Sequence, residues 1–377
     1  MTTLFQHARK LDAHGQVDDF WMLVEGDTIT RVGNGEGPAA DETVDVGGHW
    51  LTPGFIDLHC HGGGGYSFDN GPDSISNGLT VHRAHGTTRS VISLVANPLA
   101  HLRESLELIS EIAAHDPLVL GAHLEGPFLE HEHRGAHNLD YLREPQPASV
   151  DELLSSSHGI LRQITLAPDL PNALEAIDIL VEAGVTVAIG HTGATFEQAQ
   201  EAFLRGARLV THAFNAMPGI HHRAPGPIVA AFENDAVVLE LILDGLHVHP
   251  DVARLAFASA PGRVALVTDA MAAAGSSDGD YQLGSLAVTV ADGKAVLRGT
   301  TTIAGSTLTL DRALRLAIET VGLSPREAVE AVTYTPARAL GLEHEHGLLA
   351  PGYAADAVAL DHAWTVTDVW AAGRRVR

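Results

Sequence analysis

Several residue types are scarce in this chain, and each shortage excludes a class of protein. Lysine occurs only as Lys10 and Lys294, so the Gly-Lys-Ser/Thr signature of a Walker phosphate loop is missing. The same scarcity makes a Schiff-base lysine an unpromising basis for catalysis. The single cysteine, Cys60, cannot form an intrachain disulfide, which fits a protein of a reducing compartment.

Long apolar runs and an excess of positive charge are also missing. No apolar stretch reaches about 18 residues, and the N-terminus lacks the charged-then-apolar pattern of a secretory signal. The 47 Asp and Glu residues outnumber the 23 Lys and Arg residues, and the formal net charge is −24. Nucleic acids and anionic membranes bind basic faces, so we expect neither as a partner. We expect a soluble, cytoplasmic protein.

Apolar runs alternate with helix-like segments through the middle of the 377-residue chain. The helix-like segments include 99–115, 172–183, 196–205 and 250–259. Buried strands that alternate with helices form right-handed parallel units, and eight such units predict a (β/α)₈ TIM barrel. The eight runs are 55–59, 88–94, 118–123, 161–166, 185–189, 208–211, 237–243 and 264–268.

Both ends of the chain have the texture of short β-strands. Segments 20–24 and 28–32 flank a hairpin turn at 25–27, and strand-like segments return at 357–360 and 365–370. We therefore expect a small β-sandwich domain built from 1–51 and 347–377, and a barrel domain of 52–346. Within the latter, we expect a β excursion at 281–297 and helices at 307–321 and 324–340.

Histidines and carboxylates follow the predicted strands at their carboxyl ends. A His-x-His pair alone is more often two core or surface histidines than a metal site. Here, however, six such residues follow five different strands, and the carboxyl ends of barrel strands meet at one mouth. Imidazole and carboxylate ligands suit first-row divalent cations, so we predict a metal site. Its residues are His59, His61, Glu125, His191, His212 and Asp269.

Seven motifs carry a resemblance that covers nearly the whole chain. The most discriminating are His-Leu-Glu-Gly-Pro-Phe at 123–128 and Thr-His-Ala-Phe-Asn-Ala-Met-Pro at 211–218. The others are Gly-Ala-His-Asn (135–138), Gly-His-Thr-Gly-Ala (190–194), Asp-Gly-Leu-His-Val (244–248), Leu-Val-Thr-Asp-Ala (266–270) and Ile-Ala-Gly-Ser-Thr-Leu-Thr (303–309). Together they resemble the amidohydrolase superfamily, and more narrowly the N-acetylglucosamine-6-phosphate deacetylase family. The resemblance implies hydrolysis of the acetamide of N-acetyl-D-glucosamine 6-phosphate to D-glucosamine 6-phosphate and acetate.

The resemblance also bears on the metal. Many superfamily members bridge two ions with a carboxylated lysine, but neither lysine here lies at a predicted strand end. Glu125 is therefore the candidate bridge. Some family members lack His-x-His and hold one ion; because His59 and His61 are both present, we expect two ions, with one as the alternative. Zinc suits the ligands best, and iron, manganese and cobalt remain alternatives.

Two residues are expected to take part in the chemistry. Asp269 resembles the family's catalytic aspartate, which acts as general base and then general acid; a role as metal ligand alone is the alternative. His137 is expected either to stabilise the negative charge that develops on the carbonyl oxygen or to bind a sugar hydroxyl. Both readings stay open.

Substrate contacts are implied by the resemblance as well. Arg223 matches the family's phosphate-binding arginine, whose guanidinium fork suits phosphate oxygens. With His247 it is expected to contact the phosphate across the interface of a homodimer, and backbone N–H groups near Asn215 and Ala216 are further expected donors. The full expected set is Ala136, His137, Asn215, Ala216, Arg223, His247, Ile303 and Gly305.

Other readings of the same residues stay open. The chain could be an N-acetylgalactosamine-6-phosphate deacetylase, or another barrel hydrolase with the same metal ligands. A non-catalytic scaffold is the remote alternative, since such a protein would be expected to have lost ligands. Strand alternation points Cys60 away from the metal and into the core. His131 and His133 are expected in a polar loop at the mouth, and His221 has no assigned role.

Overall fold

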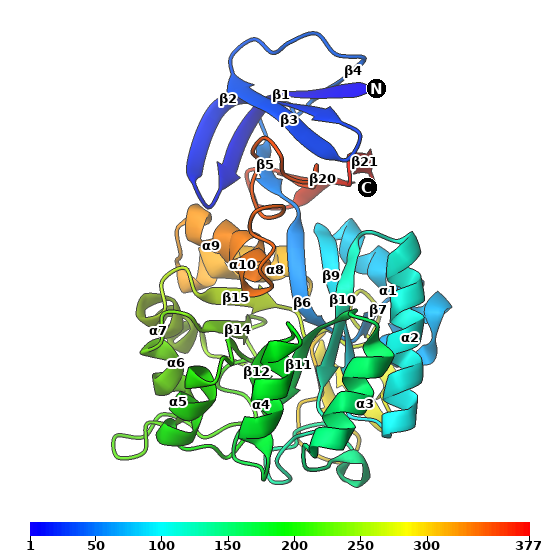
Figure 1. Ribbon diagram of the computed structural model, residues 1–377. Helices are drawn as coiled ribbons and strands as arrows, with labels where there is room; N and C mark the ends of the chain where they lie inside the picture. Colours follow the sequence, from blue (N-terminus) through cyan, green and yellow to red (C-terminus); the bar gives the residue numbers. More distant parts are fainter.

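The computed structural model describes all 377 residues and has a closed barrel beneath a smaller sheet, with both termini on the smaller sheet (Figure 1). Eight parallel strands form the barrel, and neighbours in the chain are neighbours in the sheet. All eight expected strands are confirmed. They are β6 (Phe55–Cys60), β9 (Thr87–Val95), β10 (Val119–Glu125), β11 (Leu161–Leu166), β12 (Thr186–Ile189), β13 (Leu209–Val210), β14 (Val238–Ile242) and β15 (Val264–Val267).

Helices cover the outside of the barrel because the strands are apolar on both faces and must be buried twice. One hydrophobic core of 75 buried residues joins strands to helices. The outer helices are α1 (Pro72–Ala84), α2 (Leu99–His115), α3 (Pro147–Ser157), α4 (Ala173–Glu182), α5 (Phe196–Leu204), α6 (Gly226–Phe232), α7 (Pro250–Ser259) and α8 (Leu310–Leu316). Helix α5 starts with a capping box between Thr195 and Gln198. None of the helices is long and apolar enough to cross a bilayer.

The two segments expected as single helices near the C-terminus are each divided. The first begins at α8 and continues as a π-helical turn over Ala317–Val321. The second breaks at Thr333 into α9 (Pro325–Val332) and α10 (Tyr334–Ala339). Pro336 explains this break, because proline has no N–H to donate to the carbonyl of Val332 in a continuous helix.

The barrel closes between its first and last strands at the ends that carry the predicted ligands. The N–H of Asp269 donates to His59 O and the N–H of His61 donates to Ala270 O, both at 2.8 Å. Below these bonds, Thr268 Oγ1 donates to Asp57 Oδ2 at 2.6 Å. Backbone pairing at the closure therefore places the loop after β15 against the His-x-His segment.

Strands from both chain ends form one hydrogen-bonded sheet of eight strands, as expected for the small β domain. The sheet curls on itself. The ring centroids of Phe5 and Trp370 are 5.0 Å apart, with the ring planes at 87°, although two other strands lie between the strands that carry these residues. The expected limits 1–51 and 347–377 stay a prediction. The strands are β1 (Thr2–Asp12), β2 (Gly15–Glu25), β3 (Thr28–Asn34), β4 (Glu42–Asp45), β5 (Trp50–Pro53), β19 (Ala357–Leu360), β20 (Val366–Ala371) and β21 (Arg374–Arg375).

A buried ion pair links the small sheet to the barrel. Arg89 on β9 donates from Nε to Asp356 Oδ2 at 2.6 Å and from Nη2 to Asp356 Oδ1 at 3.2 Å. The N–H of Ala372, in the turn after β20, donates to the same carboxylate at 2.7 Å. The two parts of the molecule are thus fixed to each other by a fully paired charge.

The expected β excursion is a separate three-stranded antiparallel sheet of β16 (Gly279–Leu283), β17 (Leu286–Ala291) and β18 (Lys294–Leu297). Its apolar residues pack on Val95, Met271 and other residues at the barrel mouth. A hydrogen bond of 3.0 Å from Asn138 Nδ2 to Ser285 Oγ ties the first hairpin turn to the loop after β10. A short hairpin of β7 (Gly62–Gly63) and β8 (Tyr66–Ser67) follows His61.

Candidate metal centre and active site

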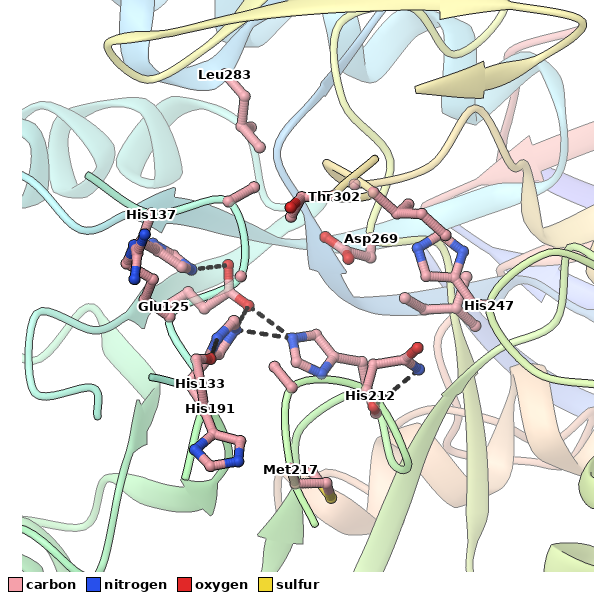
Figure 2. A pocket seen from close by; sticks show the side chains of 18 of the residues that line it. Glu125, His133, His137, His191, His212, Met217, His247, Asp269, Leu283 and Thr302 are labelled. Atoms are coloured by element: carbon pink, nitrogen blue, oxygen red, sulfur yellow. Dashed lines mark hydrogen bonds and ion pairs between the residues drawn. The ribbon is translucent and has the colours of Figure 1, made fainter. Parts of the chain in front are cut away.

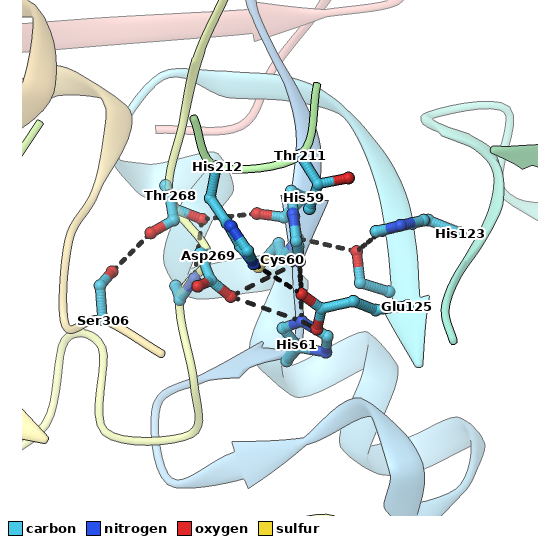
Figure 3. Close-up of polar contacts among 12 residues, drawn as sticks. His59, Cys60, His61, His123, Glu125, Thr211, His212, Thr268, Asp269 and Ser306 are labelled. Atoms are coloured by element: carbon cyan, nitrogen blue, oxygen red, sulfur yellow. Dashed lines mark hydrogen bonds and ion pairs between the residues drawn. The ribbon is translucent and has the colours of Figure 1, made fainter. Parts of the chain in front are cut away.

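The six predicted ligands meet at the carboxyl end of the barrel. Glu125 is the last residue of β10, and His59 lies within β6. His191, His212 and Asp269 each lie two residues beyond the end of a strand, which are β12, β13 and β15. Figures 2 and 3 show these side chains pointing toward one another. Strand ends that are far apart in the chain therefore assemble one cluster.

The cluster consists of two triads, each with ligand atoms within 4.8 Å of one another. In the first, His59 Nε2 and His61 Nε2 are 3.0 Å apart and lie 3.5 and 3.4 Å from Asp269 Oδ1. In the second, His191 Nε2 and His212 Nε2 are 3.0 Å apart and each lies 3.0 Å from Glu125 Oε1.

Glu125 connects the two triads. Its Oε2 atom lies 3.2 Å from His61 Nε2, and its Oε1 atom lies 3.5 Å from His59 Nε2. Burial alone would raise the pKa of this carboxyl, but the neighbouring imidazoles of His59 and His137 hold the pKa of Glu125 well below its usual range. The carboxylate is thus ionised and central, as a bridging group requires.

The hydrogen-bond partners of the imidazoles fit a cation site. His191 Nδ1 lies 2.9 Å from the carbonyl oxygen of His133, which can only accept, so Nδ1 carries the proton. Burial also lowers the pKa of His191 to about 4, which keeps the ring neutral near pH 7. Its bare Nε2 atom therefore faces the centre of the cluster. A lone pair directed at a carboxylate and a second imidazole suits a divalent cation.

Three of these residues adopt a backbone conformation that favours glycine. The φ angles are +47° at His191, +26° at His212 and +47° at Asp269. Each such residue costs roughly 1–3 kcal/mol and persists where the surroundings hold it. Asp169 supplies part of the hold at His191, because its carboxylate accepts hydrogen bonds from Thr192 Oγ1 and, at 3.1 Å, from the N–H of Gly193.

A third cluster, of Asp57, Cys60 and His82, has the residue types of a metal site but not its chemistry. His82 Nε2 lies 2.9 Å from the carbonyl oxygen of Gly62 and must donate to it, so that nitrogen has no free lone pair. Burial raises the pKa of the Cys60 thiol well above its usual value. Cys60 is a buried neighbour of His82, in a different cluster from His59 and His61.

A pocket of about 470 Å³ opens over the cluster of six candidate ligands (Figure 2). Seven of the eight expected substrate contacts line it: Ala136, His137, Asn215, Ala216, His247, Ile303 and Gly305. His133 of the polar loop expected at the mouth also lines it, as do residues that were not expected, among them Glu132, Arg134, Met217, Leu283 and Thr302. The pocket is polar beside the cluster, where Glu125 and Asp269 reach it among imidazoles, and more apolar at Met217, Leu283 and Ile303.

His137 presents a hydrogen-bond donor to the pocket. The N–H of Ala96 donates to His137 Nδ1 at 3.2 Å, so the neutral ring carries its proton on Nε2. That Nε2 atom lies 3.3 Å from Glu125 Oε2. The ring is therefore oriented with its N–H beside the cluster of candidate ligands.

Two of the expected phosphate contacts occupy different positions. His247 lies in the pocket of its own chain, with Nδ1 2.7 Å from Asp244 Oδ2. Arg223 lies outside that pocket on an exposed loop, where its Nη1 atom is 2.7 Å from His222 Nε2. A contact between Arg223 and a neighbouring subunit's site stays a prediction, and His247 needs no second subunit to reach this pocket.

One expected donor is already engaged. The N–H of Asn215 donates to His212 O at 3.0 Å, because the chain turns tightly after β13. A contact of the backbone N–H groups near Asn215 and Ala216 with the phosphate stays a prediction. The side-chain Nδ2 of Asn215, a residue of the pocket lining, donates to His212 O and Ala213 O at 3.2 and 3.3 Å.

Two buried polar residues beneath the cluster were missed by the sequence analysis. Glu240 on β14 and Gln163 on β11 are fully buried, and Gln163 Nε2 donates to Glu240 Oε1 at 2.6 Å. Glu240 Oε2 accepts from His59 Nδ1 at 3.2 Å. The available signal was a single charged residue inside the apolar run 237–243.

Comparisons with known proteins place the chain in one family. The model of the amidohydrolase family matches residues 50–376. An N-acetylgalactosamine-6-phosphate deacetylase of Escherichia coli O157:H7 is 36% identical over 379 residues, 99% of either chain. An N-acetylglucosamine-6-phosphate deacetylase of Danio rerio is also 36% identical, over 99% of this chain and 96% of the relative.

Solved structures give the same assignment. A mutant of the N-acetyl-D-glucosamine-6-phosphate deacetylase of Mycobacterium smegmatis, in complex with N-acetyl-D-glucosamine-6-phosphate, has a TM-score of 0.95 at 40% identity. The match covers 100% of this chain and 99% of that one. The chain therefore belongs to the metal-dependent amidohydrolase family, within its N-acetylglucosamine-6-phosphate deacetylase branch.

Proposed function

We propose that this enzyme hydrolyses the acetamide of N-acetyl-D-glucosamine 6-phosphate to D-glucosamine 6-phosphate and acetate. In the reaction the amide C–N bond breaks, the oxygen of water joins the acyl carbon, and a proton of that water passes to the leaving nitrogen. Support comes from relatives of this activity that match the chain over nearly its full length, at up to 40% identity. The pocket over the metal cluster is a suitable place for the reacting amide.

The cluster would hold one divalent cation on each triad, with Glu125 between them. Zinc is the proposed metal, because the donors are imidazole nitrogens and carboxylate oxygens. A cation bound there supplies a Lewis acid and lowers the pKa of bound water from 15.7 to about 7. The neutral His191 and the ionised Glu125 are in the protonation states that metal ligands need.

Asp269 and His137 would carry out the proton and charge steps. The side chain of Asp269 is 11% exposed and lines the pocket, so a carboxylate oxygen can take a proton from the attacking water and return it to the leaving nitrogen. His137 Nε2–H would donate to the amide carbonyl oxygen, which gains negative charge as the water adds. This arrangement favours the charge-stabilising role of His137 over the hydroxyl-binding role.

The substrate phosphate would be bound at the side of the pocket formed by Ala216 and His247. His247 Nδ1 is engaged by Asp244, whose pKa is below its usual value because the His247 contacts outweigh burial. His247 Nε2 is then the atom left to meet the phosphate. Arg223 of a second subunit would add the guanidinium, which makes a homodimer the proposed working unit. A reducing, cytoplasmic location is proposed from the single buried Cys60.

The observation that carries the proposal is the meeting of six ligand-type side chains beneath a pocket, in a chain that matches those relatives. The test is acetate release by purified protein of measured zinc content. N-Acetylglucosamine 6-phosphate should be hydrolysed much faster than N-acetylglucosamine. Equal rates would remove the phosphate role of Arg223 and His247, and no release from either sugar would refute the function.

A second candidate is the galacto epimer of the same substrate. It is favoured by the Escherichia coli O157:H7 N-acetylgalactosamine-6-phosphate deacetylase, which is as similar to the chain as the Danio rerio enzyme of the gluco epimer. The two sugars differ only at the C4 hydroxyl. Comparison of kcat/KM for the two epimers decides between the candidates.

A further inference from the structure

We infer that Glu240 is the positioning residue of the proposed metal centre, holding His59 and the backbone of His212 through one carboxylate. The inference rests on the proposed metal-dependent function. Glu240 lies in the middle of β14, and its side chain is completely buried beneath the cluster. It belongs to neither ligand triad.

The Glu240 carboxylate contacts both triads. Its Oε2 atom lies 3.2 Å from His59 Nδ1 and 3.4 Å from the backbone nitrogen of His212. The first contact fixes the proton of His59 on Nδ1, which turns Nε2 toward His61 and Asp269 as a ligand atom. The second supports His212 where its backbone takes the left-handed conformation, at φ +26°. One side chain thus sets the geometry of a ligand in each triad.

Gln163 holds Glu240 in place from the other side. Its Nε2 atom donates to Glu240 Oε1 at 2.6 Å, whereas Gln163 Oε1 has no hydrogen-bond partner. The only ion pair of Glu240 is to His59, and no arginine or lysine lies beside it. A buried carboxylate without a permanent cation is costly, and an apolar residue would pack in its place at lower cost. The presence of a carboxylate at position 240 is explained by its contact with His59 Nδ1, which orients the His59 ring.

The test compares Zn²⁺ binding by the wild-type chain with binding by Glu240→Leu and Glu240→Gln. Each protein is stripped with a chelator and titrated against a competing fluorescent indicator. In Glu240→Leu, His59 loses its acceptor, and Zn²⁺ affinity is expected to fall about 10- to 100-fold. The absorption bands of Co²⁺ bound in place of Zn²⁺ should change as well, because the ligand field is altered.

Glu240→Gln is the conservative variant and should restore binding. Its Oε1 can accept from His59 Nδ1, and the unpaired Gln163 Oε1 can accept from the new amide after the Gln163 amide flips. Zn²⁺ affinity within about threefold of wild type is expected, since the hydrogen bond to the ligand is kept. If Glu240→Gln loses as much affinity as Glu240→Leu, or if Glu240→Leu binds like wild type, the inference is overturned.

Controls separate positioning from folding and from the proposed function. Asp356→Asn removes another buried carboxylate far from the cluster, and it should lower stability without changing Zn²⁺ affinity. If Glu240→Leu does not fold, the double variant Gln163→Leu/Glu240→Leu is used instead. It also removes the Gln163 amide that would be left without a partner, and its Zn²⁺ affinity is compared with that of the wild type. Absence of Zn²⁺ binding by the wild-type chain would refute the proposed metal centre, whereas equal binding by wild type and Glu240→Leu refutes the role of Glu240 alone.

Discussion

The backbone N–H of Ala96 donates to His137 Nδ1 at 3.2 Å and thereby sets the proton of His137 on Nε2, beside Glu125. Ala96 directly follows β9, whereas His137 comes from the loop after β10. A donor carried by a loop is therefore held by the end of a barrel strand, where negative charge would develop during amide hydrolysis.

His137→Ala should lower kcat about 10²- to 10³-fold, the usual loss for one donor to a developing oxyanion. KM should change little, because the donor acts chiefly in the transition state. Steady-state kinetics with N-acetylglucosamine 6-phosphate measures both. A rise in KM with unchanged kcat would instead assign His137 to a sugar hydroxyl.

Asp269→Asn should keep the bound metal and lose turnover by about 10²- to 10⁴-fold, since the amide cannot accept the proton of water. Asparagine tolerates the φ of +47° at this position, so the backbone should be retained. Metal analysis of the same sample distinguishes lost catalysis from a lost ligand. An active variant would refute the acid–base role.

Metal-free His191→Gly should be more stable than metal-free His191→Ala by about 1 kcal/mol. Both variants remove the ring, but only glycine adopts the φ of +47° without steric cost. Urea unfolding at equal pH measures the difference. The reverse order would show that the turn relaxes once the ring is gone.

Asp356→Asn should destabilise the protein by about 3–5 kcal/mol, because it leaves Arg89 buried and unpaired. Burial alone would raise the pKa of Asp356, but nearby His346 and the Arg89 fork hold this pKa below the ordinary 3.8. His346 Nδ1 is 3.7 Å away, so the shorter Arg89 contacts dominate.

The sign of the pH dependence follows. A carboxyl with a lowered folded-state pKa stabilises the protein fully above its unfolded pKa, and the gain is lost as the pH falls through the folded value. The difference in the free energy of unfolding between the wild type and Asp356→Asn should therefore be constant from pH 7 to about 5 and should shrink below about pH 4. Urea unfolding of both proteins across this range measures it, and a difference that grows on acidification would contradict the assignment.

Arg223→Ala should raise KM for the phosphorylated sugar because a guanidinium contact to phosphate is lost. If Arg223 serves the partner subunit, a mixture of Arg223→Ala and Asp269→Asn chains should recover activity. Each mixed dimer then has one site with both an intact Asp269 and an intact Arg223 of its neighbour. No recovery after co-refolding or co-expression would place the action of Arg223 within its own chain.

The barrel and the candidate metal-ligating residues at its strand ends are predictable from local sequence patterns. Apolar runs such as 264–268 must be buried on both faces, and the candidate ligands that follow five of the eight runs are expected at strand ends. His59, Glu125, His191, His212 and Asp269 required no knowledge of distant contacts beyond the closure of the sheet. The hairpin at 25–27 and the four helix-like segments were found for the same reason.

Contacts between distant residues were not predictable. No local sequence pattern predicts that Glu240 contacts His59, which is 181 residues earlier, or that Gln163 contacts Glu240, which is 77 residues later. The engagement of the Asn215 N–H, the break at Thr333 and the position of Arg223 outside its own pocket also depend on how the chain turns in space.

The sequence by itself determined that strands alternate with helices and that the chain carries the residue types of a metal-dependent hydrolase, because burial and ligand chemistry are properties of single residues and short runs. Only the tertiary structure decided which nitrogen of each imidazole faces the cluster, since the proton position is set by the partner on the other side of the ring. It also decided the three left-handed backbone conformations at His191, His212 and Asp269, because contacts with distant parts of the chain support them.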